Sequence, residues 1–223
     1  MQAITKRRLG FLAGFSAYFI ALWVLWNTPV VYPLKLFVVL LHELSHGVAA
    51  IVTGGRIEAI ALTAQEGGMC VCPGGNAFLT LSAGYLGSLG WGALLIEASR
   101  LRGRGPRLAL AATGATVFGL ALLFVRNVFG FLFGLAFGVT LAACARFLPA
   151  RLTPPILVTL GLTSCLYALL DIKSDVIDRS WLQSDARLLA ELTGVPTVGW
   201  GILWIGLAIV ASAWLFRRAY RLA

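Results

Sequence analysis

Both histidines of this 223-residue chain lie within one short motif, His42-Glu43-Leu44-Ser45-His46. Helical positions four apart share one face, so the two imidazoles can bind a single metal ion. Glu43, between them, can then act as the general base that takes a proton from water activated by the metal. The motif is typical of a zinc-dependent hydrolase.

A catalytic zinc site usually has three protein ligands and keeps one position open. Since the chain has no further histidine, the third ligand must be a carboxylate or a thiolate. Asp171 is our first candidate, because it follows an apolar run whose helix can bring the carboxylate to the depth of the histidines. Asp175, one helical turn further on, is the alternative third ligand; beside Asp171 it could share the site or hydrogen-bond a ligand.

The motif lies in an apolar stretch of a very apolar chain. Hydrophobic residues make up 59% of the sequence and charged residues 12%, and the mean hydropathy is +0.88. Soluble domains carry about 25% charged residues, so the composition predicts an integral, multi-pass membrane protein. Ionisable side chains within a membrane span are costly, and they usually mark a functional site.

The net charge of +9 comes from basic residues clustered at the ends of apolar runs. That placement indicates contact with lipid headgroups of the bilayer and not with nucleic acid. The basic residues divide almost equally between the two sides of the expected bundle, so the membrane orientation stays open.

Apolar runs long enough to cross a bilayer fill most of the chain. Two of them are separated only by Arg126-Asn127 and form a helical hairpin or one broken helix, so we expect six or seven spans. We expect an all-α, polytopic membrane helical bundle that forms a single domain over residues 1–223, with the first run retained as an anchor. The runs are about 9–26, 31–52, 77–98, 108–125, 128–147, 156–170 and 198–216.

The segment 56–75 differs, because two short β-prone runs flank Gly67-Gly68 and so predict a short β-hairpin after the motif helix. An open strand edge cannot face lipid, so this segment must lie at the membrane interface or in a protein-lined cavity. For Cys70 and Cys72 we expect neither a metal site nor a disulfide. Lys35, near the start of the motif helix, is expected to snorkel toward water.

Several motifs together resemble the short bacterial branch of the site-2 protease family. The resemblance covers nearly the whole chain from Leu41 onward. It rests on HELSH, the Gly54-Gly55-Arg56 triplet, SAGYLGSLGWG (82–92), YALLDIKSDVIDR (167–179), Ser184-Asp185-Ala186 and a Trp-rich final span. Better-studied members carry Leu-Asp-Gly where this chain has Leu170-Asp171-Ile172.

The resemblance implies an intramembrane zinc metallopeptidase. His42 and His46 would then be zinc ligands, Glu43 the catalytic residue and Asp171 the third ligand. It also implies a membrane-protein substrate, a bacterial cell membrane, and a 56–75 hairpin that presents substrate as an added strand or merely connects two spans. Apart from the resemblance, Asp185 is a candidate N-cap for a helix over residues 186–192.

Our prediction is therefore a zinc metalloendopeptidase that hydrolyses peptide bonds in or near transmembrane segments. The alternative is a non-catalytic, metal-binding membrane scaffold or pseudoprotease. A metal transporter is disfavoured, since the polar groups within the spans gather at one or two points and do not line a path. The substrate, the trigger and the oligomeric state are left open by the sequence.

Overall fold

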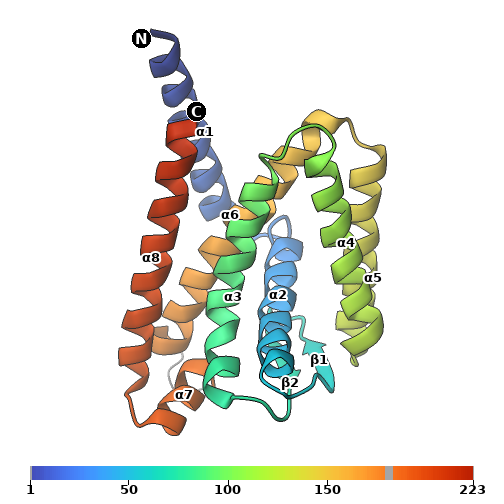
Figure 1. Cartoon of the computed structure of the whole chain (residues 1–223), viewed down its shortest axis with the longest axis vertical. Coiled ribbons are helices and arrows are strands. Elements are labelled where there is room, and N and C mark those ends of the chain that lie inside the picture. The colour runs from blue at the N-terminus through green and yellow to red at the C-terminus, as the bar shows by residue number, and fades with distance from the viewer. Residues whose placement is uncertain (1, 179–182, 223) are drawn as a thin grey trace.

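The chain folds, in a computed structural model, into a helical bundle with one small sheet (Figure 1). The structure describes residues 2–178 and 183–222; Arg179, the last residue of the YALLDIKSDVIDR motif, lies outside this part. The helices are α1 (Gln2–Leu25), α2 (Tyr32–Val52), α3 (Ala77–Ala98), α4 (Gly105–Phe124), α5 (Val128–Phe147), α6 (Thr153–Lys173), α7 (Asp185–Thr193) and α8 (Thr197–Leu222). Short 3-10 and π-helices, η1 (Ala150–Leu152) and η2 (Ser174–Asp178), flank α6, and the strands are β1 (Ala59–Leu62) and β2 (Gly68–Val71).

Seven of these helices are long and apolar enough to cross a membrane, all except the short α7. The prediction of a multi-pass, all-α membrane protein is thereby confirmed, and the higher of the two expected span numbers holds. Helices α4 and α5, the two runs separated by Arg126-Asn127, form an antiparallel helical hairpin (Figure 1). Their backbones meet closely at Gly114 and Gly138.

Helix α2 lies in the middle of the bundle and is its most buried span. Helix α3 packs closely on both α2 and α6 through small residues, which let helix backbones approach in lipid. A Cβ atom at Gly87 would overlap the side chain of Ser45, and one at Gly92 would lie 2.7 Å from the carbonyl oxygen of Gly161. The indole N–H of Trp91 also donates to Ser45 Oγ, at 3.1 Å.

The predicted hairpin is present, with β1 and β2 antiparallel and Ile60 opposite Cys70. It runs along α2 for most of that helix. At one end Tyr32 Oη donates to the carbonyl of Ala64 (2.9 Å), and at the other the N–H of Asn76 donates to Thr53 Oγ1 (2.9 Å). Of the two locations that the sequence left open, the structure therefore favours a protein-lined one.

The outer edge of β1 is covered by the turn between α4 and α5. The Asn127 side chain accepts from the N–H of Leu62 (3.0 Å) and donates to its carbonyl (2.6 Å), as a neighbouring strand would. The N–H of Arg126 donates to the carbonyl of Ile60 at 3.0 Å. This edge is thus satisfied by protein, as a strand at membrane depth requires.

Lys35 holds the tip of the hairpin. The expectation that its side chain snorkels toward water is wrong. Its side chain is only 5% exposed, its Nζ lies 3.1 Å from the carboxylate of Glu66, and it sits 4.8 Å from the centre of the Trp26 ring. Tyr167 Oη donates to the Glu66 carbonyl (3.2 Å). The ion pair and the aromatic ring replace the hydration that a charge at this depth would otherwise need.

At the other end of β2, Cys70 and Cys72 form a disulfide. The expectation that this pair makes no disulfide is therefore wrong. Side chains two residues apart on a strand point to the same side, which brings the two sulfur atoms together. The remaining cysteines, Cys144 and Cys165, are free.

Helix α7 packs against α3 and α8 through a small apolar cluster that includes Tyr85, Leu189 and Trp204. Its N-cap is Ser184, whose hydroxyl accepts from the N–H of Arg187 (3.4 Å). The assignment of the cap to Asp185 is therefore wrong by one residue. Asp185 is the first residue of the helix, and its side chain is directed into the bundle.

Candidate metal centre

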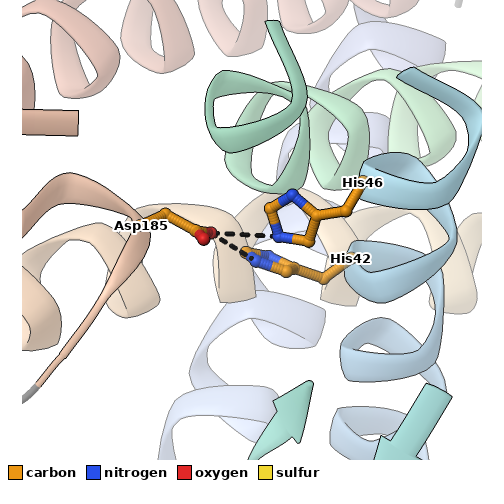
Figure 2. A group of neighbouring side chains, drawn as sticks. All are labelled: His42, His46 and Asp185. Carbon is orange, nitrogen blue, oxygen red and sulfur yellow. Dashed lines mark hydrogen bonds and ion pairs between the residues drawn. The ribbon is translucent and has the colours of Figure 1, made fainter. Parts of the chain in front are cut away.

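The two histidines and one carboxylate converge in the described structure (Figure 2). Asp185 Oδ2 lies 3.0 Å from His42 Nε2 and 3.1 Å from His46 Nε2. The three potential ligand atoms lie within 4.8 Å of one another, and all three side chains are largely buried. As Figure 2 shows, Asp185 reaches across from α7 toward the histidines of α2.

Each imidazole has a partner on its far side. His46 Nδ1 lies 2.7 Å from the carbonyl oxygen of Thr80 on α3 and so donates its proton there. That bond sets the tautomer and leaves the Nε2 lone pair of a neutral imidazole available to a metal. His42 Nδ1 lies 3.7 Å from a carboxylate oxygen of Asp171, which is longer than a hydrogen bond.

Close packing by α3 limits the room around the rings. Gly84 lies directly against them: a Cβ at this position would overlap His42 Nε2 and would lie 2.6 Å from His46 Nε2. Glycine at this point therefore allows α3 to approach the imidazoles without displacing them.

The Asp185 carboxyl is set up to remain ionised. Burial raises its pKa, but attraction to the protonated imidazoles of His46 and His42 and hydrogen bonds with them outweigh burial, so the pKa lies below the ordinary value. A metal cation in place of those ring protons would favour the ionised carboxylate in the same way. An ionised oxygen beside two imidazole nitrogens is a donor set that zinc accepts. The residues present therefore fit a zinc ion.

The other two acidic residues of this region have different partners. Asp171, the predicted third ligand, lies on the Nδ1 side of His42, away from the point where the two Nε2 atoms meet. Asp175, the alternative, accepts a hydrogen bond of 2.6 Å from Tyr85 Oη. The choice of Asp171 over Asp175 stays a prediction, and Asp185 joins it as the carboxylate nearest to both histidines.

Asp185 was hard to recognise from the sequence. It lies in the polar stretch between two apolar runs, where an Asp after a Ser is ordinarily a helix-capping residue. The one available signal was its place in Ser184-Asp185-Ala186, among the motifs that carried the family resemblance.

Glu43 is buried, and β2 lies against it. Gly68 packs on its carboxylate so closely that a Cβ there would overlap Oε1, and the backbone N–H of Cys70 points toward the same carboxylate. The bonds from Thr63 N–H to the Gly67 carbonyl and from Glu58 N–H to the Val71 carbonyl show which residues of β2 face β1. By strand alternation, Gly68 and Cys70 turn their backbone groups to the opposite edge.

A cavity of about 1030 Å³ connects these groups. Its wall includes both histidines, Glu43 and all three acidic residues of the region, together with β2 and one side of α7. The residues lining it include His42, Glu43, His46, Gly68, Met69, Cys70, Asp171, Asp175, Asp185 and Leu188. The arrangement offers a potential metal site and a carboxylate at the surface of one hollow large enough for a stretch of peptide.

An integral membrane protein with a potential metal site beside a buried glutamate belongs to a narrow class of proteins. Comparison with family models identifies it: the model described as Peptidase M50B-like matches residues 15–215, so the chain belongs to that family. This agrees with the resemblance to the site-2 proteases. No curated protein and no solved structure matches the chain.

Proposed function

We propose that this protein is a zinc-dependent endopeptidase that hydrolyses peptide bonds in or near the transmembrane segments of other membrane proteins. The observation that carries the proposal is the meeting of His42, His46 and Asp185 beside Glu43, in a cavity alongside a membrane-spanning helix. A bacterial cell membrane is the location we propose, on the family resemblance.

His42, His46 and Asp185 would hold the zinc ion, with Asp171 orienting His42 through Nδ1. Bound there, zinc would supply Lewis-acid activation of water and of the scissile carbonyl. Asp171 as third ligand, as the sequence predicted, is the competing assignment. Asp185 is preferred because one of its oxygens is within 3.1 Å of both Nε2 atoms.

Glu43 would move the proton. Its carboxylate lines the cavity next to His42, and the N–H of Cys70 points toward it. From that position it would accept a proton from the attacking water and donate one to the leaving amine nitrogen. Its burial keeps bulk water from competing for that proton.

The outer edge of β2 would present the substrate. An α-helical substrate uses its carbonyl and N–H groups in its own hydrogen bonds, so it must unwind before attack. An extended segment added to β2 would satisfy its backbone by β-augmentation while passing Glu43. What supports this part is that the edge of β1 is already covered by Asn127, whereas Gly68 and Cys70 of β2 line the cavity.

The test uses purified protein reconstituted with single-span peptides whose apolar segment is interrupted by Gly or Pro, which weaken the helix. Wild type should cut some of these peptides within the span, as measured by mass spectrometry. Glu43→Gln should retain its zinc and lose cleavage by a factor on the order of 10²–10⁴. If Glu43→Gln cut as well as wild type, the mechanism would be wrong; zinc without any hydrolysis by wild type would favour the scaffold alternative.

A further inference from the structure

The Cys70–Cys72 disulfide lies at the wall of the candidate active site, next to the strand that contacts Glu43. Both sulfur-bearing residues line the cavity and are half-buried. By contrast, Cys165 is buried within α6. A small dithiol entering the cavity therefore has access to this disulfide.

This disulfide contributes little to holding the fold together. A disulfide stabilises mainly by closing a long loop in the unfolded chain, and this one spans a single residue, Val71. The hairpin base is already closed by backbone bonds, from Arg56 N–H to the Pro73 carbonyl (3.1 Å) and from Glu58 N–H to the Val71 carbonyl (2.9 Å). The pair therefore calls for another explanation than global stability.

Cys70 connects the disulfide to the proposed chemistry. Its side chain forms the bond to Cys72, and its backbone N–H points to the edge of β2 that lies beside the Glu43 carboxylate, where Gly68 packs on the same group. The bond restricts the backbone of Cys70, Val71 and Cys72 to conformations that bring the two sulfur atoms together. Opening it removes this local restraint at the point where β2 contacts Glu43, while the backbone bonds keep the hairpin base closed.

We propose that Cys70 and Cys72 are a site of thiol–disulfide exchange, at which a dithiol reductant lowers the peptidase activity by releasing β2 from Glu43. The effect on activity rests on the proposed function, whereas the exchange itself does not. In this proposal the oxidised pair is the active form, because β2 lies against the Glu43 carboxylate in the structure, which holds the disulfide.

The exchange balances with one dithiol. A thiolate of the reductant attacks one sulfur of the pair, which breaks the Cys70–Cys72 bond and forms a mixed disulfide. The second thiol of the reductant then displaces the protein sulfur and closes a disulfide within the reductant. Two electrons and two protons pass to Cys70 and Cys72, which end as thiols; an oxidised dithiol reverses the reaction.

The experiment titrates the detergent-purified protein with dithiothreitol and follows three quantities. Alkylation with a maleimide reagent counts the thiols, hydrogen–deuterium exchange follows the amide of Cys70, and the single-span peptides measure cleavage. Reduction should add two reactive thiols, increase exchange at Cys70 and lower cleavage by about tenfold or more, since small displacements at a catalytic group have effects of this size. Oxidised dithiothreitol should restore all three values in the same sample.

Two variants serve as controls. Cys70→Ser/Cys72→Ser should behave like the reduced protein and should not respond to dithiothreitol, which separates reduction of the pair from removal of zinc by the reagent. Cys144→Ala/Cys165→Ala should respond as wild type does.

Two results would overturn the proposal. One is that reduction adds no reactive thiols to those counted before dithiothreitol; the other is that cleavage is equal in the oxidised and the reduced protein. If wild type cuts nothing in either state, the proposed function fails. The thiol count and the exchange at Cys70 then decide separately whether the redox site and its effect on β2 exist.

Discussion

The two edges of the β-hairpin face different surroundings. The edge of β1 is closed by protein, with the Asn127 side chain bonded to both backbone groups of Leu62. The edge of β2 lines the cavity and contacts Glu43 through Gly68 and Cys70. A strand edge left without backbone partners is costly at membrane depth. The closed edge of β1 therefore serves stability, and the edge of β2 is the one to which our proposal assigns substrate binding.

The sharpest way to break this comparison is Gly68→Ala on the β2 edge. The added methyl group would overlap the Glu43 carboxylate and would lie 2.7 Å from Cγ1 of the buried Val39. We therefore expect cleavage to fall about 100-fold because the catalytic group is displaced, together with a loss of stability of about 1–3 kcal/mol from overpacking. The matched control is Gly67→Ala, since Gly67 faces β1 and its added Cβ meets Thr63 Oγ1, at 3.0 Å, and not Glu43. Equal losses in the two variants would remove the special role of the β2 edge.

The next largest effect is expected at the tip of the β-hairpin, where the Lys35–Glu66 ion pair holds both strands in position. Glu66→Gln leaves the buried ammonium of Lys35 without its counter-charge, and we expect a loss of about 2 kcal/mol, less than for a fully buried pair because the Glu66 side chain is 31% exposed. The double variant Lys35→Met/Glu66→Gln removes the charge altogether and should be more stable than Glu66→Gln alone. Thermal unfolding in detergent measures both, and a double variant less stable than the single one would contradict this role of the ion pair.

The smallest effect is expected on the β1 edge. Asn127→Ala leaves the N–H and the carbonyl of Leu62 without the side chain that bonds them, which should cost about 1–2 kcal/mol. The cleavage rate of the folded protein should change less than it does in Gly68→Ala. Asn127→Asp would place a carboxylate oxygen where the amide nitrogen now lies, 2.6 Å from the Leu62 carbonyl oxygen, so it should unfold at or below the temperature of Asn127→Ala.

The same hairpin shows what the sequence can and cannot predict. The seven spans and the hairpin were predictable, because apolar length, β-prone runs and a Gly-Gly turn are local signals. The helix of the histidines and the helical pitch that puts them on one face were local as well. The partner of Lys35 was not predictable, since Glu66 is distant in sequence and meets it only when the hairpin folds back along α2.

The residues of the candidate site likewise include some that a local motif predicts and some that depend on tertiary packing. His42, Glu43 and His46 follow from one motif, whereas the carboxylate beside them depends on how α7 packs. Asp171 and Asp175 follow an apolar run and so were visible as candidates. Asp185 comes to the histidines only because Ala186 and Leu189 bury α7 against α3 and α8.

The zinc content of the purified protein tests the central claim most directly. We predict about one zinc per chain in wild type, as a structural or catalytic zinc site binds a single ion. The same amount should remain in Glu43→Gln, most of it in Asp171→Ala, and almost none in His46→Ala or Asp185→Ala. Zinc retained in Asp185→Ala but lost in Asp171→Ala would identify Asp171 as the third ligand. Wild-type protein that binds no zinc after reloading would contradict the proposal that this protein is a zinc-dependent endopeptidase.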